Sequence, residues 1–153
     1  MAYRGQYADA FLDGPVFQDQ KDVWQKRLTS PVAGQHTIVA EEDGTLAGFA
    51  CVFGGEDARW GTLLDNIHVD PQRKREGIGL QLMLEVAAWA DRAYPATGFY
   101  LWVLEANAPA RRFYERLGAH NAEQTTFEPP GGGRVRILRY TWSTPRTLLV
   151  AAN

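Results

Sequence analysis

The segment from Gly61 to Ala93 constrains the fold more than any other part of the sequence. It opens with a run rich in β-prone residues, Gly61 to Val69, which predicts a strand that stops at Asp70-Pro71. A basic turn follows, and the segment Gly77-Ile78-Gly79 then leads into a largely apolar helix predicted over Gly79 to Ala93. A strand, a short turn and a helix in direct succession indicate an α/β architecture in which the helix begins near the end of the strand.

The rest of the chain predicts more strands and further helices. Asp43-Gly44 is a strong signal for a two-residue hairpin between β-prone runs on either side. The predicted strands cover Thr37–Ala40, Leu46–Phe53, Phe99–Leu104, Glu123–Phe127 and Val135–Trp142. The other predicted helices cover Asp19–Leu28 and Ala108–Leu117, the latter capped by Asn107 and ended by Gly118. This order predicts one mixed α/β sheet and a single domain over residues 1–153.

Composition limits the classes of function. The chain has 153 residues, of which 45% are hydrophobic and 22% charged, the usual mix of a globular protein. Its net charge of −2 argues against a nucleic-acid partner bound through many phosphates. Cys51 is the only cysteine, so no internal disulfide can form and no cysteine-rich metal site is expected. Because no signal peptide and no apolar run of about 18 residues is present, we expect a cytoplasmic protein without a membrane partner.

The start of the predicted helix is suited to binding a phosphate group. A helix N-terminus exposes unpaired N–H groups and carries a partial positive charge, and glycines there allow close approach to the backbone. Arg73, Lys74 and Arg75 add positive charge beside it. The alternative is a tight turn with a solvated basic face. A P-loop is excluded because no Gly-Lys-Ser/Thr follows, and Leu82 stands where a dinucleotide fingerprint needs its third glycine.

Two motifs together make the sequence similar to the GNAT superfamily of N-acetyltransferases. Val69-Asp70-Pro71 and Gly77-Ile78-Gly79 resemble its strand end and cofactor turn. Its second motif is matched, in the family order, by Asn107, Ala110, Phe113, Tyr114 and Gly118. The resemblance covers about residues 37–142 and implies a mixed, mostly antiparallel, splayed central sheet flanked by helices.

The sequence departs from the family pattern at two places. Lys74 stands where the family has Arg or Gln, which leaves binding by the backbone of the turn intact. Members also usually open with a strand and a longer helix, and this opening is missing ahead of the segment that Tyr3-Arg4-Gly5 resembles. Either the chain is shortened, so that the fold lacks the usual first strand, or another segment covers the sheet edge.

The resemblance implies that acetyl-CoA is the acyl donor and that no metal is required. Its pantetheine arm would pair with the backbone of Ile67, His68 and Val69 as an added strand does. Its pyrophosphate would bind the turn and helix start, formed by Lys74, Arg75, Glu76, Gly77, Ile78, Gly79 and Leu80. Asn107 would either contact the pantetheine arm or cap its helix.

The same resemblance makes Tyr114 the candidate general acid that protonates the departing CoA thiolate. Spacing alone favours a core role, because Tyr114 continues an apolar stripe with Phe113 and Leu117. Asp65, His68 and Glu105 are the candidates for the general base, with bulk water as the alternative. Trp102 is the tryptophan expected to line an acceptor pocket, and Cys51, in an apolar run, is expected to be a buried structural thiol.

The predicted activity is transfer of acetyl from acetyl-CoA to a primary amine by direct attack in a ternary complex. The alternative is a non-catalytic acyl-CoA-binding regulatory module, against which Tyr114 argues because a sensor needs no acid at the sulfur. The expected partner is a small-molecule or peptide amine, with polyamines, amino acids, antibiotics and protein N-termini all open. The sequence leaves open whether the protein forms a homodimer.

Overall fold

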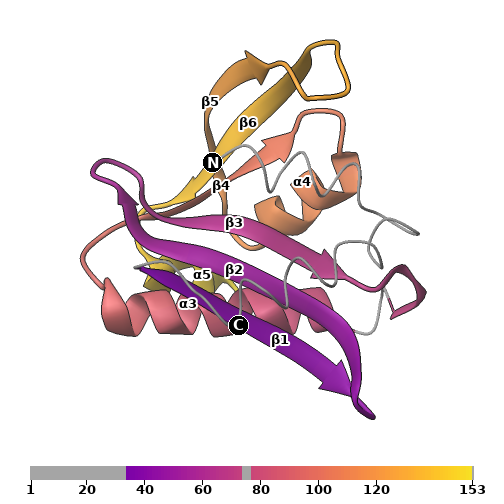
Figure 1. Cartoon of the computed structure of the whole chain (residues 1–153). Coiled ribbons are helices and arrows are strands. Elements are labelled where there is room, and N and C mark those ends of the chain that lie inside the picture. Colours follow the sequence, from indigo (N-terminus) through magenta and orange to yellow (C-terminus); the bar gives the residue numbers. More distant parts are fainter. Residues whose placement is uncertain (1–33, 74–76, 153) are drawn as a thin grey trace.

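The computed structural model describes residues 34–73 and 77–152, and the elements within these ranges are shown in Figure 1. The strands are β1 (Gln35–Glu42), β2 (Thr45–Asp57), β3 (Gly61–Val69), β4 (Phe99–Leu104), β5 (His120–Phe127) and β6 (Val135–Trp142). The helices are α3 (Ile78–Ala93), α4 (Ala108–Arg116) and α5 (Pro145–Ala151), with a short 3-10 turn at Pro71–Arg73. Among the described residues the strands form one six-stranded sheet in the order β1-β2-β3-β4-β6-β5. This confirms the predicted mixed, mostly antiparallel sheet with helices.

The first hairpin forms where the sequence predicts it. Asp43 and Gly44 both have positive φ, 55° and 76°, and Glu42 pairs directly with Thr45. Positive φ at both central residues is the turn geometry that matches the right-handed twist of the two strands. A local Asp-Gly signal therefore sets the register of the first pairs of β1 and β2, before a bulge shifts it by one residue between Ala40 and Glu41.

The main core lies between the sheet and α3. Met83, Val86, Ala87 and Ala90 are fully buried and follow the spacing i, i+3, i+4, i+7. This spacing places them on one face of the helix, which packs against inward-facing strand residues such as Ala50, Leu64, Leu101 and Leu138. Figure 1 shows α3 running along one face of the sheet.

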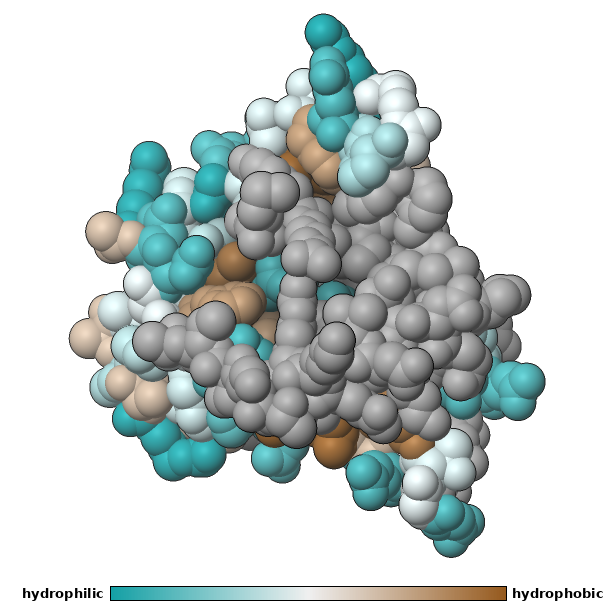
Figure 2. Space-filling view, viewed as in Figure 1, coloured by the Kyte–Doolittle hydropathy of each residue, from teal (hydrophilic) through white to brown (hydrophobic). Residues whose placement is uncertain are grey.

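β1 and β2 are longer than the predicted Thr37–Ala40 and Leu46–Phe53, and two further details differ from the sequence prediction. β5 begins at His120 rather than Glu123, because β6 continues to pair with it as far as Thr141. The strand is polar and mostly exposed, so its first residues carry no hydrophobic signal, and Figure 2 shows hydrophilic side chains at the far end of this hairpin. The predicted helix at Asp19–Leu28 and the question of the first strand lie outside the described residues.

The second difference is α5, which the sequence prediction did not include. It has only seven residues, too few for a clear helical period. Thr144 accepts a hydrogen bond from the Thr147 N–H, and Pro145 occupies the first turn, so the local signal was a Thr-Pro helix start. Arg146 pairs with Asp91 of α3 at 2.8 Å, and Leu148 is fully buried. α5 therefore extends the helical layer beside α3.

Candidate active site

The sheet opens between β3 and β4. These two strands are parallel and pair only at Thr62 with Phe99 and Leu63 with Tyr100, although β3 continues to Val69 and β4 to Leu104. Beyond that point β3 stays paired with β2, and β4 stays paired with β6. The C-terminal halves of β3 and β4 therefore separate, as Figure 1 shows, and one edge of β3 from Leu64 onward has no partner in β4.

Two glycines fix the closed end of this opening. The Thr62 N–H donates to the Gly98 carbonyl at 2.9 Å. Gly61 has φ +92°, and a Cβ at that position would lie 2.0 Å from the Gly98 oxygen. A Cβ on Gly98 would in turn lie 2.5 Å from the Trp60 carbonyl oxygen. The strands can approach here only because both positions lack a side chain.

A bulge in β3 gathers polar side chains beside the opening. The pairing with β2 passes from Asn66–Cys51 directly to Leu64–Val52, so Asp65 is the extra residue. Asp65, Asn66 and His68 are only 3%, 5% and 5% exposed. The side chain of His68 lies against Phe49, with ring centroids 5.3 Å apart. Phe49 belongs to a cluster separate from the α3 core, which places His68 on the opposite face of the sheet.

Asn66 is a residue that the sequence analysis did not single out. Its Oδ1 is buried and, within the described part of the chain, has no hydrogen-bond partner. Buried polar atoms normally have such a partner, so an orphan acceptor needs a specific explanation. The available signal was the polar Asp65-Asn66 pair in the middle of an otherwise apolar strand. We treat Asn66 as a candidate contact for a donor group of a ligand.

The start of α3 has no side-chain cap among the described residues. Gly77 is the N-cap residue with φ 81°, and no described side chain caps the first N–H groups. Within the described part of the chain, a Cβ on Gly77 would meet nothing within 4 Å, and one on Gly79 would meet only Val69 Cγ2, at 3.8 Å. These two positions are therefore compatible with the close approach to the backbone that phosphate binding requires. Lys74, Arg75 and Glu76 lie outside the described residues, and the side chain of Ile78 is buried in the core.

Helix α4 begins at the C-terminal end of β4 and carries Tyr114. Asn107 Oδ1 accepts a hydrogen bond from the Ala110 N–H at 3.2 Å, so Asn107 is a helix cap. Tyr114 is 5% exposed, and its ring packs edge-on against Phe113 and Trp142, with centroids 5.3 and 6.5 Å away. The ring thus has the core role that its spacing predicts, and a role of its hydroxyl in catalysis remains a prediction.

Glu105 lies in the turn between β4 and α4. Its carboxylate pairs with Arg136 at 3.5 Å, and its side chain is 36% exposed. Its backbone N–H donates to the Arg136 carbonyl at 2.9 Å. The three predicted base candidates therefore occupy both sides of the opening, with Asp65 and His68 buried on β3 and Glu105 more accessible after β4.

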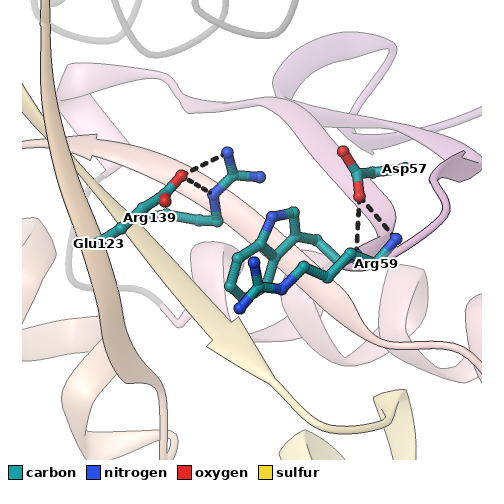
Figure 3. A network of polar contacts seen from close by, with 5 residues as sticks. Asp57, Arg59, Glu123 and Arg139 are labelled. Carbon is teal, nitrogen blue, oxygen red and sulfur yellow. Dashed lines mark hydrogen bonds and ion pairs between the residues drawn. The ribbon is translucent and has the colours of Figure 1, made fainter.

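Trp102 is part of a polar and aromatic cluster on β4 and β6. The Arg139 guanidinium lies over the rings of Trp102, Trp60 and Tyr100, at 4.2, 4.7 and 5.2 Å from their centroids. Arg139 also forms a 2.6 Å ion pair with Glu123, drawn in Figure 3. Trp102 is only 2% exposed and one of its faces is occupied by Arg139, so its predicted place in an acceptor pocket remains a prediction.

Figure 3 also shows how the turn between β2 and β3 is held. Asp57 Oδ1 accepts hydrogen bonds from the backbone N–H groups of Arg59, at 2.7 Å, and Trp60, at 2.9 Å. The hydrogen bond from Trp60 is the main cause that lowers the pKa of the Asp57 carboxyl, with Arg59 and Arg139 adding to it. This turn precedes the closed end of the opening directly.

Comparison with known proteins then identifies the family. The sequence model of the acetyltransferase (GNAT) family matches residues 3–119, most of the chain. The chain belongs to the GNAT family. A comparison with curated protein sequences gives no match. Within the described residues, no helix is long and apolar enough to cross a membrane.

Solved structures of other acetyltransferases are similar to this GNAT chain. A structure of nourseothricin acetyltransferase is 30% identical with a TM-score of 0.63, and the match covers 74% of this chain and 67% of that one. The ribosomal-protein-S18-alanine N-acetyltransferase of Escherichia coli is 22% identical, with a TM-score of 0.64 and coverage of 78% and 76%. A streptothricin acetyltransferase, described as putative, from Bacillus anthracis in complex with acetyl coenzyme A is 18% identical, with a TM-score of 0.64 and coverage of 74% and 65%.

Proposed function

We propose that this chain transfers an acetyl group from acetyl-CoA to a primary amine by direct attack in a ternary complex. One observation carries the proposal: β3 and β4 part after two residue pairs, and the part of β3 that β4 leaves unpaired leads into the N-terminus of α3, which no described side chain caps. An extended arm with an amide backbone can add to a free strand edge, and a pyrophosphate can bind a helix start. Acetyl-CoA contains both groups in one molecule.

The residues fit this donor at two places. The backbone of Ile67, His68 and Val69 lies on the part of β3 that β4 does not pair with, where pantetheine amides would hydrogen-bond. Gly77 and Gly79 leave the start of α3 open to a pyrophosphate, and Leu80 follows in the same turn, with Lys74, Arg75 and Glu76 as further candidate contacts from the sequence. Asn107 would act through its cap, because its Oδ1 accepts from the Ala110 N–H, and any contact with the arm would have to come from its Nδ2 amide.

The chemistry then needs three events at the thioester. The protonated amine loses one proton to free its lone pair, the nitrogen attacks the carbonyl carbon and loses a second proton, and the C–S bond breaks to release a thiolate that takes up a proton. Asp65, His68 or Glu105, or water held by them, would accept the first proton. The hydroxyl of Tyr114 would supply the last one. Asn66 Oδ1, buried beside the base candidates, can accept a hydrogen bond from the N–H of the incoming amine.

The similar proteins support an amine as the acceptor. One is named for the alanine of a ribosomal protein and another for nourseothricin. A peptide amine and a small-molecule amine are therefore both candidates for this chain. The alternative function, a regulatory module that binds acyl-CoA without turnover, would need Tyr114 only as a core residue, a role that its burial, at 5% exposed, also allows.

An acceptor-library screen tests the proposal. The protein is incubated with acetyl-CoA and single amines, covering polyamines, amino acids, aminoglycoside-type and streptothricin-type antibiotics and N-terminal peptides, and free CoA thiol is measured. Calorimetry with CoA is carried out on the same preparation. Binding together with amine-dependent thiol release supports the proposal. Binding without release for any amine supports the regulatory module, and absence of binding rejects both.

A further inference from the structure

Helix α4 is attached to strand β6 at two points. Near its C-terminus, the buried Trp142 Nε1 donates to the Leu117 carbonyl at 2.9 Å. Further toward its N-terminus, the side chain of Tyr140, two residues before Trp142 on the same face of β6, contacts Arg111 and Glu115. Tyr114 lies between Arg111 and Glu115 along the helix, and Trp142 packs against its ring.

The contact at Tyr140 is a chain of charged and neutral hydrogen bonds. Arg111 Nε donates to the Tyr140 hydroxyl at 3.0 Å, and that hydroxyl donates to Glu115 Oε2. Arg111 and Glu115 are four residues apart, so they lie one turn apart on the same face of α4. Arg111 also donates through its NH1 to the Glu105 carbonyl at 3.1 Å. The Tyr140 hydroxyl and Arg111 thus connect β6, two successive turns of α4 and the turn that follows β4.

This arrangement is suited to holding a helix in a single position. The ring of Tyr140 is fully buried, so it does not exchange freely between rotamers, and its position follows the sheet. Hydrogen bonds to charged groups are shorter and stronger than neutral ones. Burial, followed by the hydrogen bond to Glu115, raises the pKa of Tyr140, so its hydroxyl stays protonated and keeps donating at neutral pH. The contact therefore persists throughout the range in which an amine acetyltransferase would work.

The position of α4 decides where the Tyr114 hydroxyl lies. The ring of Tyr114 is packed between the helix and Trp142, and it cannot compensate for a helix shift by choosing another rotamer without leaving this packing. A misplacement of about 1 Å at a reacting group can lower a rate by as much as about 100-fold. We propose that Tyr140 is a positioning residue that, through Arg111 and Glu115, sets the distance between the Tyr114 hydroxyl and the CoA sulfur. This inference rests on the proposed function.

The test uses Tyr140→Phe in the full chain, which removes the hydroxyl and keeps the buried ring. Tyr94→Phe is the matched control, because Tyr94 ends α3, packs against Trp89 at 5.8 Å and does not bond to α4. Arg111→Lys is a second variant for the case that Tyr140→Phe folds poorly, since a lysine keeps the charge but cannot reach both partners of Arg111. Melting temperatures are measured for all of them.

The first readout is kinetic. With an amine from the screen, we expect Tyr140→Phe to lower kcat about 10- to 100-fold while the KM for acetyl-CoA stays within about twofold. In a Tyr114→Phe background, the same change should alter kcat less than about twofold, because the group that it positions is gone. A merely structural hydroxyl would lower the melting temperature and leave kcat unchanged, or would act equally in both backgrounds, and either result overturns the proposal.

The second readout needs no acceptor. Tyrosine rings are ¹³C-labelled, and the Tyr114 signal is assigned by its loss in Tyr114→Phe. We expect this signal to shift in Tyr140→Phe and in Arg111→Lys, and to stay in place in Tyr94→Phe. An unmoved Tyr114 signal overturns the positioning role even if no amine has been found. Failure of the proposed function is recognised separately, since the wild-type chain would then release no thiol with any amine, whether or not it binds CoA.

Discussion

At the residue scale, Tyr114 has the core role that its spacing predicts, and the proposed role as general acid would use the hydroxyl of the same side chain. Its ring belongs to the core beneath α4, and its burial is what fixes the direction of its hydroxyl. A general acid is effective only when it is held within hydrogen-bond reach of the group that it protonates. Packing on the apolar face is therefore compatible with catalysis, and the two roles must be separated by a change that affects only the oxygen.

Tyr114→Phe makes that change. We expect turnover to fall about 10²- to 10⁴-fold, the usual contribution of a general acid, with unchanged affinity for CoA because the ring remains. The measurements are steady-state kinetics, calorimetry with CoA and melting on one preparation. A purely structural tyrosine predicts full turnover with a stability loss of about 1 kcal/mol from the missing hydrogen bond. That second pattern would leave protonation of the thiolate to water.

Substitutions of Asn107 can likewise distinguish a role as helix cap from a role as ligand contact. Asn107→Ala should destabilise the protein by about 1 kcal/mol, because the Ala110 N–H loses its acceptor. Asn107→Asp keeps the acceptor and should melt within about 2 °C of the wild-type protein. CoA affinity should be the same for Asn107→Asp and the wild-type chain. Weaker CoA binding at full stability in Asn107→Asp would instead assign Asn107 to the pantetheine arm.

At the element scale, the sequence predicts the elements that local signals specify, and it does not predict those that depend on long-range contacts. Asp43-Gly44, the Asn107 cap and the spacing of α3 are each encoded within a few residues, and these elements form where predicted. The polar start of β5 and the seven-residue α5 lack such a signal, because pairing with β6 and packing on α3 stabilise them. Likewise, nothing local connects Arg111 with Tyr140, which lies 29 residues away.

The closed end of the opening depends on one close approach between elements. Gly61→Ala should destabilise the fold by about 2–4 kcal/mol, because alanine is strained at φ +92° and its Cβ would overlap the Gly98 carbonyl. Gly44→Ala is the matched control, with φ +76° but nothing within 4 Å, and should cost about 1–2 kcal/mol from strain alone. Urea unfolding of both variants measures the difference. Equal losses would mean that strain, and not the β3–β4 contact, limits residue 61.

At the scale of the whole molecule, the opening in the sheet is a property that only the assembled strands have. The sequence motifs predict a strand before the helix start, and the family resemblance predicts a splayed sheet. Neither shows that pairing with β4 stops after Leu63, that β3 has a bulge at Asp65, or that no described residue hydrogen-bonds to the buried Asn66 Oδ1. These features arise from the register between strands, which depends on contacts over many residues.

Bound acetyl-CoA would connect β3 with the start of α3, so it should stabilise the whole fold. At about 100 times its dissociation constant, CoA adds about 2.7 kcal/mol to the free energy of unfolding, which for a chain of this size raises the melting temperature by about 5–11 °C.

Gly79→Val should abolish most of this shift, because the valine side chain would occupy the space of the pyrophosphate. The ligand-free variant should melt normally, since a Cβ at residue 79 meets only Val69 at 3.8 Å among the described residues. Glu85→Val places the same side chain at an exposed position of α3 and should keep the full shift. Scanning fluorimetry with millimolar CoA and acetyl-CoA measures all three proteins. An undiminished shift in Gly79→Val would move the pyrophosphate away from the start of α3, and no shift in the wild-type chain would remove acetyl-CoA as its ligand.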